Sequence, residues 1–219
     1  MTEIEFLLWV RGPAFQGATV IFVLGVTFRL LEILILGRKA NLAEARGSAM
    51  LGGLRTIVSR SFPDAGTHKR SAFTHYVGYI FHIGFFVTLL LFAPHILVVE
   101  QVFGISWPAL PTTVVDAAAV VTMIALIAVL LHRLKDPVLR LLSNFQDYFA
   151  WFLTILPVLT GYIAFHRVGA PPQTLIAIHI LSVELLMVVF PFTKLMHAFT
   201  LFMARWYNGA IAGYRGVSS

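Results

Sequence analysis

The distribution of apolar and polar positions divides the chain into five long apolar runs separated by polar loops. A transmembrane helix needs about 20 predominantly apolar residues, and each run is close to that length or longer. The pattern therefore predicts an all-α integral membrane protein, a bundle of five transmembrane helices that forms one domain over residues 1–219. We place the spans at about Phe15–Leu36, Tyr76–Val99, Val114–Leu131, Tyr148–Phe165 and Leu175–Phe202.

Basic residues alternate between the connecting loops. The first loop is long and basic, Glu100–Thr113 contains no lysine or arginine, the third loop is basic, and the fourth holds only Arg167. Cytoplasmic loops of membrane proteins carry an excess of Lys and Arg. We therefore expect the N-terminus outside and the C-terminus in the cytoplasm, in the cell inner (cytoplasmic) membrane. Within the first loop, Leu42–Ser61 forms either a short amphipathic helix or only a basic topogenic segment.

The overall composition agrees with this pattern and excludes several kinds of site. The chain is 58% hydrophobic and 12% charged, and its net charge of +6 lies in the loops. That distribution is typical of a protein surrounded by membrane lipid, so we expect no nucleic-acid partner. The chain has no cysteine, which excludes iron–sulfur clusters, thiolate-ligated haem and covalently attached c-type haem. Any metal centre must use histidine or carboxylate ligands.

Four histidines fall at two matched depths of the predicted bundle. His179 and His197 are eighteen residues apart in one run, which is five turns of a continuous helix and ~27 Å of rise. In the predicted orientation His82 shares the cytoplasmic depth of His197, and His95 shares the outer depth of His179. Two b-type haems, each with six-coordinate iron, require two facing imidazoles at each of two depths. The four residues are therefore candidate ligands of an inner and an outer haem iron.

His95 is the weakest of the four candidates. It lies thirteen residues after His82, which is about 220° of rotation on a straight helix, so the two rings would not share a face. Pro94 removes a backbone donor, and a kink there would re-aim the His95 ring. The alternative is an interfacial histidine that ends the helix. The remaining histidines adjoin basic residues or lie in loops, and we interpret them as boundary residues: His68, His75, His132 and His166.

Two strings around these histidines resemble a known family. Tyr79–Gly84 (YIFHIG) and Phe190–His197 (FPFTKLMH) are similar to segments of the membrane cytochrome b subunit, the gamma subunit, of respiratory nitrate reductases. The spacing of His179 and His197 and the five-span topology also resemble that family, over nearly the whole chain. The resemblance implies two haems that carry electrons from quinol, at the outer side, to an iron–sulfur or catalytic subunit on the cytoplasmic side.

One position departs from the nitrate reductase pattern. The outer-haem histidine of the second helix there follows the inner one by ten residues, a position that Phe92 occupies here. The thirteen-residue offset is more similar to the related cytochromes of sulfite-reduction and heterodisulfide-reductase-like complexes. Three further segments look like that wider group: Arg133–Pro137, Asp147-Tyr148 and Thr160-Gly161. The resemblance therefore supports the superfamily more than nitrate as substrate.

Three further charged residues have two interpretations each. Arg29 and Lys194 either contact haem propionates or extend to the interface as ordinary cations. Glu184, five residues after His179, either serves quinol deprotonation or is a neutral, hydrogen-bonded acid. Glu32 is expected to pair with Arg29 or Lys39.

The sequence thus predicts a di-haem cytochrome b, the electron-transfer subunit of an oxidoreductase. Two alternatives are a haem-free membrane anchor and a proton-conducting transporter component. Packing alone does not require four histidines at matched depths, which argues against the anchor. The sequence shows no internal symmetry and no paired, interrupted half-helices, which argues against the transporter.

Overall fold

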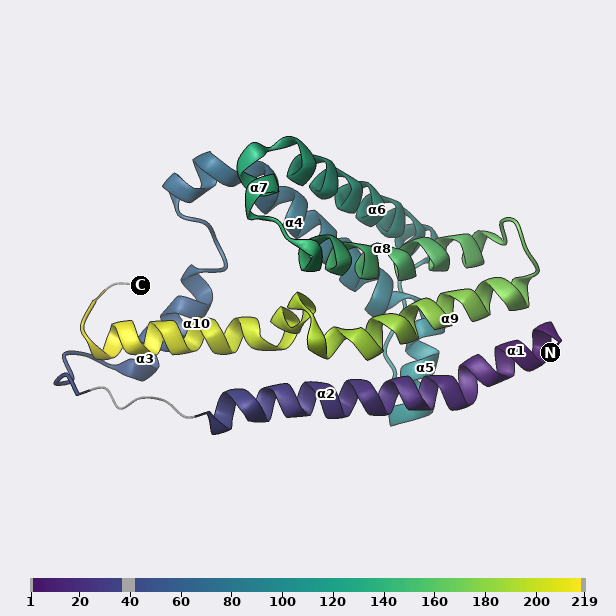
Figure 1. Cartoon of the computed structure of the whole chain (residues 1–219), viewed down its shortest axis with the longest axis horizontal. Coiled ribbons are helices and arrows are strands. Elements are labelled where there is room, and N and C mark those ends of the chain that lie inside the picture. Colours follow the sequence, from purple (N-terminus) through teal and green to yellow (C-terminus); the bar gives the residue numbers. More distant parts are fainter. Residues whose placement is uncertain (1, 37–41, 218–219) are drawn as a thin grey trace. The chain divides into compact units, whose positions relative to one another are not determined.

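The computed structural model describes residues 2–36 and 42–217, and within these ranges the chain forms helices and no strand. Figure 1 shows their order along the chain. The elements are α1 (Glu3–Trp9), η1 (Val10–Ala14), α2 (Phe15–Ile35), α3 (Ala49–Ser59), α4 (Ala65–Leu91), α5 (Ala93–Phe103), α6 (Thr112–Lys135), α7 (Pro137–Leu142), α8 (Phe145–His166), α9 (Pro172–Val189), η2 (Phe190–Phe192), η3 (Lys194–Met196) and α10 (His197–Tyr214).

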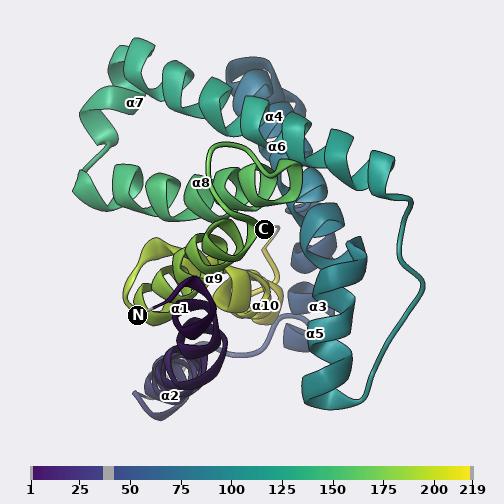
Figure 2. The same ribbon diagram turned by 90° about the vertical axis from the view of Figure 1, so that its right-hand side faces the viewer.

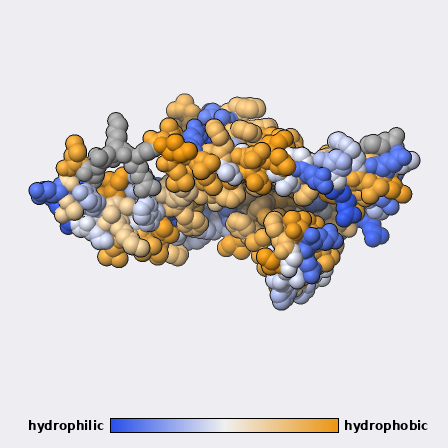
Figure 3. Space-filling view, turned by 90° about the horizontal axis from the view of Figure 1, so that it is seen from below, coloured by the Kyte–Doolittle hydropathy of each residue, from blue (hydrophilic) through white to orange (hydrophobic). Residues whose placement is uncertain are grey.

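Among the described residues, five helices are long and apolar enough to cross a membrane, as the sequence predicts. The first, second and fifth differ most from the predicted bounds. Much of the surface that Figure 3 shows is hydrophobic, as expected for side chains that face lipid. The five helical segments are Glu3–Ile35, Ala65–Leu91, Thr112–Lys135, Phe145–His166 and Pro172–Phe192.

The first helix begins twelve residues earlier than the predicted Phe15 and continues past Pro13. Thr2 caps its N-terminus and forms a capping box with Glu5, which satisfies two backbone donors. Around Pro13 the backbone changes to the wider π-helical turn of η1, because proline has no N–H for the regular α-helical bond. The acidic first turn, with Glu3 and Glu5, is therefore part of the helix.

The second predicted span is interrupted at Phe92. α4 ends at Leu91, Phe92 is extended (φ −85°, ψ 124°), and α5 begins at Ala93 with Pro94 in its first turn. Proline is tolerated at a helix N-terminus, where its missing N–H would have no intrahelical partner. The predicted kink near Pro94 is thus confirmed as a complete break between two helices.

The predicted continuous helix from Leu175 to Phe202 is wrong. Helix α9 ends at Val189, two 3₁₀ turns follow, Thr193 between them is extended (φ −120°, ψ 174°), and α10 begins at His197. Pro191 provides the physical reason, since it lacks the backbone donor that a regular helix needs there. Because the helix is broken, His179 and His197 do not lie on one straight helix. The prediction that their rings point to the same side, with a rise of ~27 Å between them, therefore no longer holds.

Pro191 is fully buried, and a glycine makes room for it. A Cβ atom at Gly25 of α2 would lie 2.6 Å from Pro191 Cγ, so a larger residue would displace the turn. The ring of Phe22 is 5.4 Å from that of Phe190 and 6.2 Å from that of Phe199. The break is therefore packed against α2, and aromatic contacts hold both of its ends.

The chain divides into two compact units, Met1–Thr19 with Phe73–Val188 and Val20–Ala72 with Val189–Ser219. The single domain over residues 1–219 stays a prediction. Within the first unit α6 and α8 pack together, joined at one end through α7 (Figure 1). The Trp151 indole donates to the Leu126 carbonyl oxygen (2.8 Å), and His166 bonds to Asp116 (2.8 Å). These bonds join the two helices at their middle and at one end.

The second unit is dominated by the packing of α3 against α10, which lie together in Figures 1 and 2. Glycines bring the two backbones together: a Cβ at Gly213 would be 2.8 Å from Gly52 Cα, and one at Gly53 would be 2.6 Å from the Trp206 indole. Small residues four apart, such as Gly209 and Gly213, allow this close approach between helices. Leu42–Ser61 therefore contains a helix, which is one of the two interpretations of this segment from the sequence.

The contact between α3 and α10 is consistent with a chain that crosses the membrane five times. Helix α3 lies between the first and second spans, and α10 follows the fifth, so four crossings separate them. An even number of crossings returns the chain to the same side of the membrane. The two helices can then pack together, whereas an odd number would separate them.

We predict that cysteines introduced at Arg55 and Arg215 react with a membrane-impermeant maleimide from the same side, and that one at Ser106 reacts from the opposite side. The chain has no cysteine of its own, so the background is low, and all three positions are exposed. Labelling of intact and inverted vesicles measures the result. The positive-inside rule further predicts that positions 55 and 215 face the cytoplasm. Opposite sides for these two positions would contradict the five-span topology.

Candidate haem-ligand site

The end of α4 leaves four carbonyl groups without the usual helical donors, and the structure satisfies all four. His95 Nδ1 lies 3.0 Å from the Thr88 oxygen and 3.2 Å from the Leu89 oxygen. The next two carbonyls receive the Trp107 indole N–H (2.6 Å, at Leu90) and the Leu110 backbone N–H (3.0 Å, at Leu91). The break before α5 therefore fixes the His95 ring as a donor to the end of α4.

His179 is held on α9 by a hydroxyl group of α8. Its Nδ1 lies 3.3 Å from the Thr160 hydroxyl, which is also 2.8 Å from the Ser182 hydroxyl. The ring packs directly on Gly161, where a Cβ atom would lie 2.9 Å from His179 Cε1. Glycine at this position is what lets the imidazole lie against the α8 backbone.

These two anchors bring the predicted outer pair together. The ring centroids of His95 and His179 are 6.2 Å apart, with an angle of 26° between the ring planes. Two imidazoles on opposite sides of one metal ion, each at a bond length of about 2 Å, have centroids roughly 6–6.5 Å apart. In both rings Nδ1 faces the anchoring oxygens, so Nε2 is the nitrogen left for a metal. This spacing fits a metal with two histidine ligands.

The predicted inner pair shows the same anchoring but lies in separate units. His82 Nδ1 is 2.7 Å from the Gly78 carbonyl oxygen, and His197 Nδ1 is 2.8 Å from the Lys194 carbonyl oxygen. His82 belongs to the first unit and His197 to the second, so their pairing stays a prediction. A metal-ligating histidine characteristically donates its other ring N–H to a carbonyl or carboxylate, and both residues have such a partner.

Glu184 is buried on α9 and lies close in sequence to His179. Its side chain is 6% exposed, and its Oε1 atom has no hydrogen-bond partner among the described residues. An unpaired polar atom in an apolar segment is costly and needs a functional or structural reason. The prediction of a hydrogen-bonded acid is therefore not met at this oxygen.

The other charged candidates lie on the surface. Arg29 pairs with Glu32 one turn later on α2, which confirms the expected pairing of Glu32. Lys194 is exposed in η3, where its carbonyl anchors His197. A role of Arg29 or Lys194 toward a haem propionate stays a prediction. The Nε2 atom of His166 bonds to Asp116 (2.8 Å), so that nitrogen is engaged.

Sequence reasoning missed the groups that orient the rings. The sequence marks Thr160 only within the segment Thr160-Gly161, and it marks neither Ser182 nor Trp107. A signal for Thr160 exists in retrospect: it lies in an apolar helix next to Gly161, a small residue that permits close approach of another helix. No comparable signal marks Trp107, whose partner carbonyl is set by the helix break.

The comparisons with known proteins give one relative. A protein of Nitratidesulfovibrio vulgaris (strain Hildenborough) is 33% identical over 209 residues, which is 93% of this chain and 88% of the relative. The chain belongs to the family of this protein. The name of the relative states no activity, so family membership carries no function to this chain. No family model matches the sequence, and no solved structure matches it significantly.

We predict that Thr160→Val lowers the free energy of unfolding by about 1–2 kcal/mol, because it removes the hydroxyl shared by His179 and Ser182. Thr154→Val is the matched control: Thr154 lies on the same helix but bonds only to the Ala150 carbonyl of its own helix (2.8 Å). Unfolding of both purified variants in detergent measures the difference. Equal losses in the two variants would show that the Thr160 contact to His179 contributes nothing.

Proposed function

We propose that the chain is a di-haem cytochrome b, the membrane subunit that transfers electrons between the quinone pool and a cytoplasmic-side partner of a respiratory oxidoreductase. The observation that carries the proposal is the His95–His179 pair, because two rings 84 residues apart in sequence are anchored through Nδ1 at the spacing of two axial ligands. Three of the four anchoring partners are backbone carbonyls, as is common for metal-ligating histidines.

His95 and His179 would hold the outer haem, and His82 and His197 the inner one. Haem b would supply a one-electron carrier at each of these two positions. The residues present fit that group: the chain offers four imidazoles whose Nδ1 atoms face protein oxygens, and it has no cysteine for covalent attachment. Because the chain also has no cysteine for an iron–sulfur cluster, its electrons would pass to or from a separate iron–sulfur or catalytic subunit.

The orientation belongs to the same proposal. Under the positive-inside rule, α3, α7 and α10 lie on the cytoplasmic side of the inner membrane, and the N-terminus lies outside. His95 and His179 are then near the outer face, where quinol would be oxidised and its protons released. The partner subunit would bind on the opposite side.

Glu184 is the proposed proton acceptor at the quinone site. Oxidation of a quinol to a quinone releases two electrons and two protons, so a base near the outer ligands is needed. The Oε1 atom of Glu184 is buried and without a partner among the described residues, one and a half turns from His179 on α9. A carboxylate in this position could take a quinol proton, with Glu184 as a positioned general base.

The helix breaks bear on the transporter alternative. The sequence argument against a transporter is the lack of paired, interrupted half-helices, yet both Tyr76–Val99 and Leu175–Phe202 are broken. Interrupted helices of transporters typically expose backbone groups near the middle of the bilayer. Here the breaks follow the ends of the apolar segments Ala65–Leu91 and Pro172–Phe192, and at the first break the four carbonyls are satisfied. The breaks therefore favour fixed histidines over a transport path.

We predict that His95→Ala and His179→Ala each remove one haem, and the same one, whereas His82→Ala and His197→Ala remove the other. Loss of one axial ligand leaves the iron with a single protein bond and weakens retention of the group. A pyridine haemochrome assay gives the haem content, and reduced spectra identify which haem remains. His166→Ala is the control and keeps both haems. Full haem content in His95→Ala would contradict the assignment of the outer ligands.

We predict that Glu184→Gln lowers the rate of quinol oxidation by about tenfold or more while haem content stays unchanged. The amide keeps the size of the side chain but cannot accept a proton. Oxidation of a soluble quinol, with ferricyanide as electron acceptor, measures the rate. Glu100→Gln is the matched control, an exposed acid on α5. An unchanged rate in Glu184→Gln would place the proton acceptor elsewhere.

A further inference from the structure

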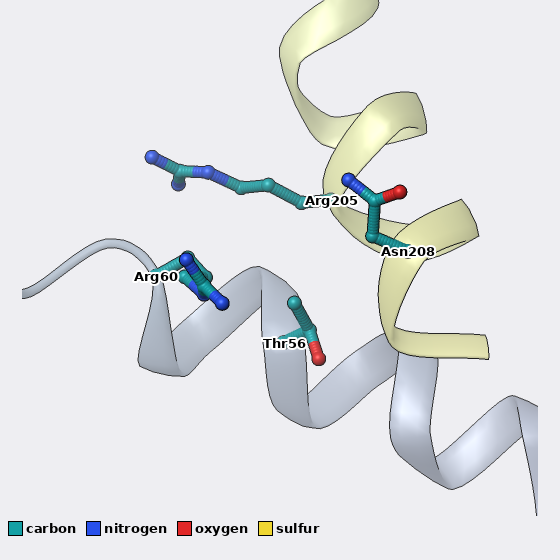
Figure 4. A pocket seen from close by; sticks show the side chains of 4 residues that line it. All are labelled: Thr56, Arg60, Arg205 and Asn208. Carbon is teal, nitrogen blue, oxygen red and sulfur yellow. The ribbon is translucent and has the colours of Figure 1, made fainter. Parts of the chain in front are cut away.

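A cavity of about 500 Å³ lies within the second unit and is lined by residues of α3 and α10 and the residue that ends α3. Its lining residues are Thr56, Arg60, Arg205 and Asn208, all drawn in Figure 4. The size falls in the range of small-molecule sites, roughly 300–1,000 Å³. Two guanidinium groups and a carboxamide are side chains that proteins use to bind phosphate oxygens. The Thr56 hydroxyl is engaged elsewhere, since it donates to the Gly52 carbonyl oxygen (2.8 Å).

The two arginines differ in how they are held. Arg205 Nη1 donates to the Ser61 hydroxyl (2.9 Å), and its guanidinium carbon lies 6.0 Å from the centre of the Phe202 ring. These contacts preposition one guanidinium beside the cavity. Arg60 is exposed and has no ion pair with any described residue. Its guanidinium is therefore available to a ligand without breaking an internal bond.

Among the described residues, no carboxylate forms an ion pair with Arg60 or Arg205. Neither α3 nor α10 contains an acidic residue, and the chain has none after Glu184. Asp64, the acid nearest to Arg60 in sequence, instead caps α4: it accepts the Thr67 hydroxyl and the Gly66 backbone N–H (3.0 Å). The Thr67 hydroxyl also holds the pKa of Asp64 below its ordinary value. The cavity is thus left for an external anion.

The two helices that form the cavity also carry exposed apolar side chains. On α3, Leu51, Leu54 and Val58 are 68%, 50% and 65% exposed, and on α10 Phe202 is 55% exposed. Helix α10 begins five residues after the fifth apolar segment ends at Phe192. A helix with arginines beside exposed apolar side chains is typical of the membrane boundary, where phosphate headgroups lie.

We propose that this cavity binds a phosphate group, with Arg60 and Arg205 as its two cationic contacts, and that the source is the headgroup of an anionic phospholipid. Asn208 lines the same cavity and adds a carboxamide to its polar wall. The proposal does not depend on haem or on quinone chemistry. A free phosphate ion has the same chemistry, and the experiment below separates the two sources.

Native mass spectrometry of the full-length protein in detergent tests the proposal, with dioleoylphosphatidylglycerol as the probe. We expect one lipid to bind, and both Arg60→Gln and Arg205→Gln to weaken its binding by about tenfold, since each removes a charge-assisted contact. Arg55→Gln is the matched control, an exposed arginine of α3 outside the cavity, and should change binding less than about twofold. Dioleoylglycerol, which lacks the phosphate, should not bind at this site.

Three outcomes decide the matter. Displacement of the lipid by millimolar inorganic phosphate, with the same dependence on Arg60, would keep the phosphate site and assign it to the free ion. Wild-type lipid binding in both Arg60→Gln and Arg205→Gln would overturn the proposal. Loss of haem in Arg60→Gln would also overturn it, because the cavity would then serve a haem propionate. Haem content measured on the same samples separates this test from that of the proposed function.

Discussion

Backbone carbonyl groups at helix ends set the positions of the histidines. In an apolar environment water is not available to donate hydrogen bonds to these groups, so other groups of the protein must donate them. At the end of α4 the His95 ring, the Trp107 indole and a backbone N–H complete the four open carbonyls. At the second break the Lys194 carbonyl accepts His197 in the same way. The breaks in the helices and the orientation of the rings are therefore one structural feature.

This constraint also fixes the chemistry available at each ring. A histidine whose Nδ1 donates to an oxygen presents the lone pair of Nε2. In His82, His95 and His197 the Nδ1 atom faces a backbone carbonyl oxygen, and in His179 it faces the Thr160 hydroxyl. Gly161 then determines how closely His179 can approach α8. The proposed haem ligation follows from these anchors together with the 6.2 Å separation of His95 and His179.

The number of apolar spans and the pairing of His95 with His179 could be predicted from sequence. Both depend on local signals, the length of apolar runs and the position of Pro94. The break after Val189 was missed although Pro191 marks it, because the apolar run continues through the proline. The packing of α3 on α10 could not be predicted, because it depends on glycines about 160 residues apart. A pattern of neighbouring residues does not indicate a contact between such distant positions. The pairing of His82 with His197 stays a prediction, because the two residues lie in separate compact units.

The central claim is that His95 and His179 are the two axial ligands of one metal centre. Electron paramagnetic resonance of the purified, oxidised protein at low temperature tests it most directly, because the signal reports the axial ligands of ferric haem. The account predicts two low-spin species, each with two imidazole ligands. A folded protein with no haem signal, or one whose haem is high-spin with an open axial position, would contradict the account.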